Sequence, residues 1–411
     1  MIKIIKPYYN YILLLIGLLA AACQPETNPT DTSVVAIDPT QALFSKASTV
    51  FSDIEYIPLL DSAIGRVRDK VLHVNNHYFV QTARPACILI YDATGKMASQ
   101  ICQGGQGHGK YRGITDFVID TKDSTVLILN RNIFKIFRYD FQGNFIADYQ
   151  IAPVYAWRFE ILDEEHFVLY CGSEITDRNT TRTVFFNHTT GELHEAYFPI
   201  KKHEARYMNF FTYNNFWRLP DGTLCAFYTL NDTIYAISRD ECRPHRIIDF
   251  GKYAITDDFL ARPHNDVMDF FSNLRKPGND FAGRMISYHE TDTYLSFIFE
   301  HRGRLPLLLY DKQAQRYQLS ARLLDDMGLP GLPLYDHADK GPKGVTDDNR
   351  LIFSLDAEYI RAHIDSVKQV SAPEAWAKLQ QEYPQWRHLN ETINISSNPV
   401  LIVAKVKPFV N

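Results

Sequence analysis

The sequence predicts an all-β protein, a six-bladed β-propeller built from four-stranded antiparallel blades. Aromatic residues make up 13 % of the 411 residues, with 24 Tyr and 26 Phe, which favours strands over a helical bundle. Short runs of alternating apolar and polar residues are separated by polar turns, and this spacing is typical of all-β folds. The chain also repeats itself with a period that fits one propeller blade.

The repeat is visible as a strand, a polar turn and a second strand. Three copies align: ILIYDATGKM (88–97), IFRYDFQGNF (136–145) and VFFNHTTGEL (184–193). Their turn glycines are 48 residues apart: Gly95, Gly143 and Gly191. A further 48 residues lead to Arg239, and a fifth copy places Ala314 at the glycine position after an insertion of 27. A glycine is expected there because a tight hairpin requires a positive φ.

The repeats define six blades and a closed ring. Five blades are expected at about 66–102, 113–149, 156–198, 207–250 and 283–320, and the sixth begins near Gly344. In the second blade, strands are expected at 113–120, 125–130, 133–140 and 144–149. The sixth blade stops at a third strand, NPVLIVAKVK (398–407), so we expect FSDIEYIPL (51–59) to supply the fourth and close the ring.

Two helical insertions interrupt the strands. Val267, Phe270 and Leu274 have the spacing of a short amphipathic helix inside the insertion 256–282. A second helical detour follows the strand 349–355 of the sixth blade, where Ser371 to Glu374 reads as a capping box with a proline just inside the helix.

Residues 101–146 carry a resemblance to a known repeat. The Gly-rich connection, an aromatic residue, a strand ending in Asp, the run NRNIFKIFRYD and a turn glycine resemble an NHL-type repeat. Together with DIEYIPLL (53–60) and the segment 398–407, the chain resembles the six-bladed β-propeller lipoproteins of Bacteroidetes. The resemblance covers nearly all of residues 50–411 and implies the fold, and it implies no particular activity.

The N-terminus has the features of a targeting segment. Lys3 and Lys6 precede a 12-residue apolar run, Tyr11 to Ala22, which is short for a membrane span and typical of a signal peptide. The ending LLAAAC resembles a bacterial lipobox, which implies acylation of Cys23 and a lipid anchor in the cell envelope, in the outer membrane. The alternative is a plain secretory peptide with an incidental cysteine. We therefore expect a signal peptide at 1–22, a flexible tether at 23–40 and the propeller at 41–411.

The stretch GGQGHGKY (104–111) is one residue away from a phosphate-binding P-loop. A P-loop requires a helix after it, whereas the residues that follow have the pattern of a strand. Tyr111 also replaces the Ser or Thr that would ligate magnesium. We expect a blade-to-blade connection here and no nucleotide.

Charge and cysteine content narrow the function classes further. The net charge is −5, and removal of residues 1–22, with two lysines and no acid, leaves −5 − 2 = −7. This balance gives no reason to expect nucleic acid. The five cysteines after Cys23 are odd in number and have no C-x-x-C spacing, so neither a disulfide framework nor a zinc site is predicted, and most are expected to be buried.

A basic residue precedes or opens each predicted inner strand, where side chains from several blades can converge on a central channel. This predicted ligand-binding ring comprises Arg66, Arg112, Arg158, Arg206, Arg284 and Lys343. Three aromatic residues accompany it: Tyr111, Trp157 and Tyr207. Guanidinium groups beside aromatic rings suit a carboxylate-bearing or sugar-like ligand. The alternative is that these are solvated strand-edge charges or are paired to neighbouring acids.

A second set of residues predicts a metal site. Asp116, Glu160 and Asn209 also fall on inner strands, and oxygen ligands from separate blades could hold one calcium ion, as in six-bladed lactonase propellers. The alternative is a set of partly exposed polar residues.

No complete catalytic constellation can be assembled, and no catalytic residue is predicted. The sequence therefore favours a non-enzymatic envelope lipoprotein whose channel face binds a ligand or partner, such as a glycan or a companion membrane protein. A calcium-dependent propeller hydrolase is the alternative.

Overall fold

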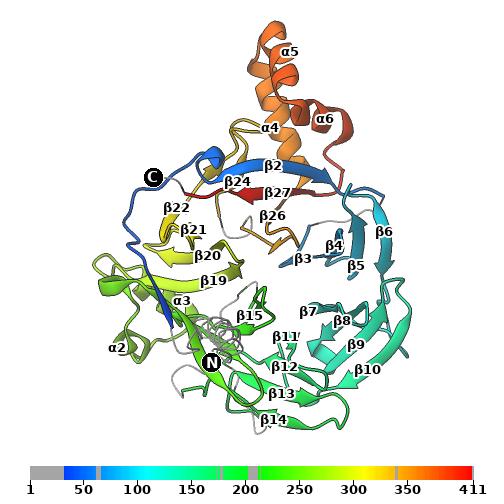
Figure 1. Ribbon diagram of the computed structural model, residues 1–411, viewed down its shortest axis with the longest axis vertical. Helices are drawn as coiled ribbons and strands as arrows, with labels where there is room; N and C mark the ends of the chain where they lie inside the picture. Colours follow the sequence, from blue (N-terminus) through cyan, green and yellow to red (C-terminus); the bar gives the residue numbers. More distant parts are fainter. Residues whose placement is uncertain are drawn as a thin grey trace, which may run out of the picture. The chain divides into compact units, whose positions relative to one another are not determined.

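The residues that the structure, a computed structural model, describes form a six-bladed β-propeller, as predicted (Figure 1). The description covers residues 32–61, 66–173, 175, 179–201, 212, 214–337 and 341–409. The chain divides into two units, Met1–Ser33 and Val34–Asn411, and the propeller belongs to the second.

Each of the first three blades is a four-stranded antiparallel sheet whose strands follow the chain order from the centre outward. Blade one contains β3 (Val71–Val74), β4 (His77–Gln81), β5 (Ile88–Asp92) and β6 (Met97–Ile101). Blade two contains β7 (Asp116–Asp120), β8 (Thr125–Asn130), β9 (Lys135–Asp140) and β10 (Phe145–Gln150). Blade three contains β11 (Arg158–Ile161), β12 (His166–Tyr170), β13 (Thr183–Asn187) and β14 (Leu193–Glu195).

The other three blades keep this plan with additions. Blade four contains β15 (Phe216–Arg218), β16 (Leu224–Ala226), β17 (Thr233–Ile237) and β18 (Cys242–Asp249). Blade five contains β19 (Ala282–Glu290), β20 (Tyr294–His301), β21 (Leu307–Asp311) and β22 (Arg316–Ser320). Blade six contains β25 (Gly344–Val345), β26 (Leu351–Leu355), β27 (Val400–Val406) and β2 (Phe51–Pro58). A small sheet of β23 (Leu323–Leu324) and β24 (Pro333–Tyr335) lies between blades five and six.

The N-terminal strand closes the ring, as predicted. β2 pairs antiparallel with β27, from Phe51 opposite Val406 to Pro58 opposite Val400. The chain before it also follows the rim: Leu43 bridges to Leu319 of blade five, next to the junction with blade six. The outer edge of blade six is therefore covered by the chain's own N-terminal segment.

The propeller begins earlier than the predicted boundary at residue 41. β1 (Ser33–Ala36) lies beside β18 as a fifth strand of blade four. Val35 and Ile37 are buried against blades four and five, which explains why this part of the expected tether is ordered as a strand. The predicted signal peptide and Cys23 lie outside the described residues.

The hydrophobic core lies between the blades. One cluster joins blades one and two around Phe117 and Tyr139, and another joins blades two and three around Leu127 and Phe167. The other neighbouring blades are joined in the same way, and the last cluster joins blade six back to blade one. Aromatic and β-branched side chains fill these layers because both faces of each blade are covered.

The repeated glycines are required for close packing between blades as well as for turn geometry. Gly95 and Gly143 have φ of 82° and 86°, as their hairpin position requires. A Cβ atom at Gly95 would also lie 2.1 Å from the carbonyl oxygen of Pro58, and one at Gly143 would lie 2.7 Å from that of Gln100. Each glycine therefore lets its turn pack against the outer strand of the preceding blade.

Five helices lie in the two predicted insertions. The first insertion contains α2 (Asp257–Leu260) and α3 (Val267–Leu274), in which Phe270 and Leu274 are buried as predicted while Val267 is exposed. The second contains α4 (Ala357–Val370), α5 (Pro373–Glu382) and α6 (Pro384–Thr392), which project from blade six (Figure 1). Within the described chain, no helix is long and apolar enough to span a membrane.

The predicted capping box is wrong in detail. Pro373 is the first residue of α5, as expected, but the N-cap residue is Ala372, which makes no side-chain cap. The Ser371 hydroxyl instead donates to the carbonyl oxygen of Val367 at 2.7 Å, a typical length for such a hydrogen bond. Ser371 therefore ends α4 and does not begin α5, because two helices adjoin at this point.

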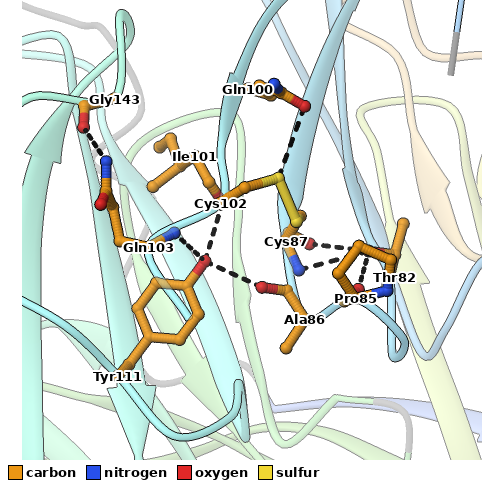
Figure 2. Close-up of a disulfide and its surroundings, with 10 residues drawn as sticks. All are labelled: Thr82, Pro85, Ala86, Cys87, Gln100, Ile101, Cys102, Gln103, Tyr111 and Gly143. Atoms are coloured by element: carbon orange, nitrogen blue, oxygen red, sulfur yellow. Dashed lines mark hydrogen bonds between the residues drawn. A yellow bond between two sulfur atoms is a disulfide. The ribbon is translucent and has the colours of Figure 1, made fainter. Parts of the chain in front are cut away.

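A disulfide that the sequence did not predict joins Cys87 and Cys102 at the end of blade one (Figure 2). Cys171 and Cys225 are free and buried, in line with the expectation for most cysteines, and Cys242 is half-buried. The bridge joins the residue before β5 to the residue after β6, two positions that lie opposite each other in the sheet. Strand pairing, which brings these cysteines together, is not visible in their spacing along the chain.

The disulfide is expected to stabilise the propeller. Closing a loop with a separation of 15 residues contributes about 3 kcal/mol by restricting the unfolded chain. Replacing Cys87 and Cys102 together by Ser should therefore lower the melting temperature in oxidising buffer. In a reducing buffer, the wild-type protein and the double variant should melt together, and a gap that persists there would show that the loss came from packing.

Candidate functional site

The long connections of the propeller all emerge on one face. Because the four strands of a blade alternate in direction, each connection to the next blade and each loop between the second and third strands leave on the same side. We call this side the loop face; its largest segments are 250–281, 321–343 and 356–399. The opposite side carries tight turns such as 75–76 and 121–124. The loop face also holds the start of each inner strand, where the basic ring was predicted.

Arg158 binds groups from four blades at the centre of this face. It opens β11 and is buried, and its Nη2 donates to Asp69 Oδ2 and to the carbonyl oxygen of Thr212, each at 2.9 Å. Its Nη1 donates to the carbonyl oxygens of Trp157 at 2.9 Å and Thr115 at 3.4 Å. These residues precede the inner strands of blades one to four. Arg158 therefore holds the starts of these four strands together. This agrees with the alternative that basic residues of the ring are paired to neighbouring acids, here Asp69.

Asp116 lies in a second set of contacts between the inner strands. Its Oδ1 forms a 2.8 Å ion pair with the Lys70 ammonium, and its Oδ2 accepts from the backbone N–H of Phe159 at 3.1 Å. Lys70 also lies 5.2 Å from the centroid of the Phe117 ring. Both carboxylate oxygens of Asp116 are thus engaged, and its charge is paired with a cation of the chain.

Glu160 has an unusual electrostatic environment. Burial raises its pKa above the ordinary range of a glutamate, and the charges of Arg218 and Lys70 only partly oppose this effect, while Asp116 adds to it. One carboxylate oxygen accepts from the backbone N–H of Ile161 at 3.0 Å. The Asp116 charge acts on Glu160, and Asn209, the third residue of the predicted calcium site, lies outside the described residues.

The Glu160→Gln variant is expected to melt at a higher temperature than the wild-type protein at neutral pH. A carboxyl whose pKa is raised in the folded state stabilises the fold fully below its unfolded pKa, and this contribution is lost as pH rises through the folded pKa. The neutral amide avoids that loss. The gain should shrink as the melting buffer is made acidic, and Glu164→Gln, at a solvent-exposed position, is the control. A Glu160→Gln variant that melts lower at neutral pH would show that the carboxylate is held mainly by its cations.

The remaining basic residues of the predicted ring are in different environments. Arg66 is exposed and forms a 3.1 Å ion pair with Asp356, and Arg112 is exposed on the loop face. Arg284 pairs with Glu300 at 2.6 Å, and Lys343 is buried. Arg206 lies outside the described residues. Within the described chain, the predicted ring is thus a mixture of structural and solvent-facing charges.

The structure corrects the role expected of Tyr111. Its ring is fully buried between blades one and two, and its hydroxyl lies 2.8 Å from the carbonyl oxygen of Ile101 and 3.0 Å from that of Ala86 (Figure 2). β7 follows this connection, so the helix that a P-loop requires does not follow it. Tyr111 packs in the core, because its side chain seals the gap between two blades. Tyr207 lies outside the described residues.

Trp157, in contrast, is exposed and forms part of an aromatic surface with Tyr155. The side chains are 38 % and 41 % exposed, and they are the two aromatic members of the exposed large apolar residues in the described chain. Val154 and Ala156 are buried between blades two and three, so the alternation directs Tyr155 and Trp157 outward. We call Tyr155, Trp157 and Arg131 the aromatic platform.

Arg131 fixes the platform in place. Its guanidinium carbon lies 3.8 Å from the centroid of the Trp157 ring and 5.1 Å from that of Tyr155. Its backbone N–H donates to the Thr115 hydroxyl at 3.0 Å, and Phe134 packs edge-on against Tyr155. The loops 131–134 and 151–157 therefore present a rigid aromatic surface on the loop face, next to Arg158, which begins β11.

Sequence reasoning missed several of these residues. Asp69 and Lys70 immediately precede β3. The rule that selected the basic residue Arg66 could have included Lys70, whereas the acidic Asp69 falls outside it. Tyr155 is two residues before Trp157, and the same alternation along the chain marks both as outward-facing. Arg131 comes from a different loop of the neighbouring blade, and only the packing of blade two on blade three brings it to the platform.

The fold and site define a six-bladed propeller with an elaborated loop face, and comparison with known proteins places it in a family. The chain belongs to the family described as "Domain of unknown function (DUF4934)", whose model matches residues 35–405. A comparison with curated proteins gives no match.

Solved structures share the fold at low sequence identity. The chain is similar to a protein named "Putative exported protein" from Bacteroides fragilis NCTC 9343, with 16 % identity, a TM-score of 0.69 and coverage of 91 % of this chain and 100 % of the other. A member of the duf4221 family from Bacteroides vulgatus ATCC 8482 shows 12 % identity, a TM-score of 0.49 and coverage of 87 % and 98 %. The first of these supports the propeller fold and nothing finer.

Proposed function

We propose that this protein is an exported, non-enzymatic binding protein that holds a glycan on the aromatic platform of its loop face. The observation that carries the proposal is the exposure of Tyr155 and Trp157 on the loop face. Exposed aromatic rings on a rigid support are uncommon on a soluble surface and mark binding sites.

The chemistry of the platform suits a sugar. The indole N–H of Trp157 and the hydroxyl of Tyr155 make no hydrogen bond within the described chain, so each ring offers a flat apolar face and a free polar group. A pyranose ring presents the matching combination of C–H faces and hydroxyl groups. Arg112, exposed on the same face, adds a cation for a carboxylate-bearing sugar.

Export and lipid anchoring form part of the proposal. The Cys87–Cys102 disulfide supports an oxidising compartment, since such bonds are rare in reducing cytoplasm. The similar Bacteroides fragilis protein is named as exported, and the LLAAAC segment supports acylation at Cys23, with attachment to the outer membrane. A companion membrane protein in place of a glycan would use the same loop face.

The calcium-dependent hydrolase stays a prediction that the described residues do not favour. Lys70 neutralises Asp116 directly, and the described chain contains no group of three or more His, Cys, Asp or Glu residues that could hold a metal ion. The residues present do not fit a calcium site, and we assign no catalytic step to them.

The proposal is tested by affinity electrophoresis of residues 24–411 in gels that contain acidic or neutral polysaccharides. The wild-type protein should be retarded by at least one of them, and the Tyr155→Ala/Trp157→Ala double variant should migrate as it does in a gel without polysaccharide. Ile146→Ala is the matched control, since this residue is 52 % exposed on β10, outside the platform. Equal retardation of wild type and double variant, or no retardation in any gel, would contradict the proposal.

A further inference from the structure

The loops around the aromatic platform carry basic residues and no acidic ones. Four consecutive loops of blades one to three lie on the loop face: 82–87, 102–115, 131–134 and 151–157. These loops contain no Asp or Glu, and their lysine and arginine residues are Arg84, Lys110, Arg112 and Arg131. We call these four residues the basic strip.

The charge of the strip is opposite to that of the rest of the protein. The chain has a net charge of −5, and the three largest segments of the loop face each contain more acidic than basic residues. Positive charge on this face is therefore gathered over blades one and two, where it can attract an anionic ligand.

A disulfide and a buried tyrosine hold the first two of these loops together. Cys87 at the end of loop 82–87 is bonded to Cys102 at the start of loop 102–115, and the Tyr111 hydroxyl lies 3.0 Å from the carbonyl oxygen of Ala86 (Figure 2). The loop that carries Arg84 is therefore fixed beside the loop that carries Lys110 and Arg112.

Backbone hydrogen bonds connect these loops to the platform. The N–H of Arg131 donates to the Thr115 hydroxyl at 3.0 Å, which joins loop 131–134 to the end of loop 102–115. The N–H of Ile151 donates to the carbonyl oxygen of Phe134 at 2.8 Å, which joins loop 151–157 to loop 131–134. The basic strip and the aromatic platform therefore lie on one connected set of loops.

Three of the four cations face solvent, with no acid to neutralise them. Arg84, Lys110 and Arg112 are exposed, and their side chains form no ion pair or hydrogen bond within the described part of the chain. Arg131 belongs to both groups, since its guanidinium carbon lies 3.8 Å from the centroid of the Trp157 ring. A ligand on the platform is therefore flanked by positive charge.

The combination of the two groups restricts the chemistry of the ligand. Positive charges spread over several loops match negative charges that repeat along an extended molecule. The aromatic rings match the pyranose rings between those charges. A neutral glycan has no group for the basic strip, and an acidic peptide has no pyranose ring for the platform, whereas an acidic polysaccharide has both features.

We propose that the glycan held by the platform is an acidic polysaccharide, whose carboxylates lie on the basic strip while a pyranose ring packs on Tyr155 and Trp157. This assignment rests on the proposed function and names the chemical class of its ligand. The carboxylates bind Arg84, Lys110 and Arg112 from solvent, so salt weakens the interaction.

The test is biolayer interferometry of residues 24–411 on sensors coated with polygalacturonate or alginate. Fully methyl-esterified polygalacturonate is the matched probe, because it has the same sugar backbone without the negative charge. We expect saturable binding to an acidic probe that is about tenfold or more tighter than binding to the ester. Binding to the acidic probe should weaken steadily between about 0.05 and 0.5 M NaCl.

A matched pair of variants locates the charges that matter. Lys110→Gln/Arg112→Gln should weaken binding to the acidic probe about fivefold or more. Lys96→Gln/Arg239→Gln removes the same two charges from exposed positions outside the strip, in the hairpins 93–96 and 238–241, and should bind as the wild-type protein does. Both variants should keep the wild-type melting temperature, since all four side chains are exposed.

The outcomes separate this assignment from the proposed function. Equal binding to polygalacturonate and its ester, or no binding to either acidic probe while a neutral polysaccharide still retards the protein in the gel, would overturn the assignment and leave the platform as a site for neutral glycans. Equal weakening in the two charge variants would also overturn it. Binding to immobilised polyglutamate as tight as to the acidic polysaccharides would assign the strip to an acidic protein instead. Failure of every polysaccharide to bind would contradict the proposed function as well.

Discussion

A chain that begins at Leu60, and so lacks β1 and β2, is expected not to fold into a stable monomer. β2 places five apolar side chains in the core: Phe51, Ile54, Tyr56, Ile57 and, just after the strand, Leu59. At about 1.5–3 kcal/mol each, their burial is worth roughly 8–15 kcal/mol. That is similar to the whole stability of a typical domain, about 5–15 kcal/mol. The removal also exposes the backbone edge of β27, which favours aggregation.

A chain that begins at Thr32 is the matched control, because it retains both strands. Soluble yield, size-exclusion elution and thermal melting of the two chains provide the comparison. The control should be monomeric and melt cooperatively, whereas the shorter chain should be aggregated or lack a cooperative transition. Equal melting temperatures for the two chains would show that the ring does not depend on β2.

The second large loss of folding stability is expected for the Glu290→Gln variant. The Glu290 side chain is fully buried at the end of β19, where Arg246 lies at 2.5 Å, Lys312 at 3.0 Å and His245 at 3.1 Å. Tyr288 also donates to its carboxylate. Removal of this one negative charge leaves the surrounding cations unpaired, and breaking a buried pair in this way costs about 3–5 kcal/mol. The melting temperature should fall by several degrees.

The pH dependence of this effect has a definite sign. Burial would raise the pKa of Glu290, but the hydrogen bond from His245 and the charge of Arg246 hold it well below its usual range. A lowered pKa stabilises the fold above the unfolded pKa, and this contribution is lost as pH falls through the folded value. The difference between wild type and variant should therefore narrow in strong acid. Glu391→Gln, which removes an exposed pair with Arg387, should cost less than about 1 kcal/mol at every pH.

The sequence predicted the architecture because the same local sequence pattern recurs from blade to blade. The turn glycines, the alternating strands and the unfinished sixth blade were sufficient to place the blades and to assign β2 to the ring closure. The sequence did not predict β1, whose four residues follow a polar segment and become a strand only because β18 offers an edge. The Cys87–Cys102 bridge was missed for a related reason, since the two cysteines meet only when β5 and β6 pair.

The candidate site was harder to predict because position along a strand does not specify a side chain's partners. Arg158 is the first residue of β11 and is buried among four blades, whereas Arg112 lies four residues before β7 and is exposed. Asp116 has the spacing of a metal ligand, but Lys70 from blade one satisfies it. Such pairings depend on contacts between blades, which no single repeat encodes.

Tryptophan fluorescence provides the most direct test of ligand binding at the platform. Trp157 is exposed, whereas Trp386 is buried and Trp217 and Trp376 are half-buried, so a ligand on the platform should change the emission of Trp157. Titration with the polysaccharide that retards the wild-type protein should give a saturable emission change. That change should disappear in Trp157→Phe, which keeps an aromatic surface and therefore some retardation in the gel. A saturable change of equal size in Trp157→Phe would place the ligand elsewhere and contradict the proposed function.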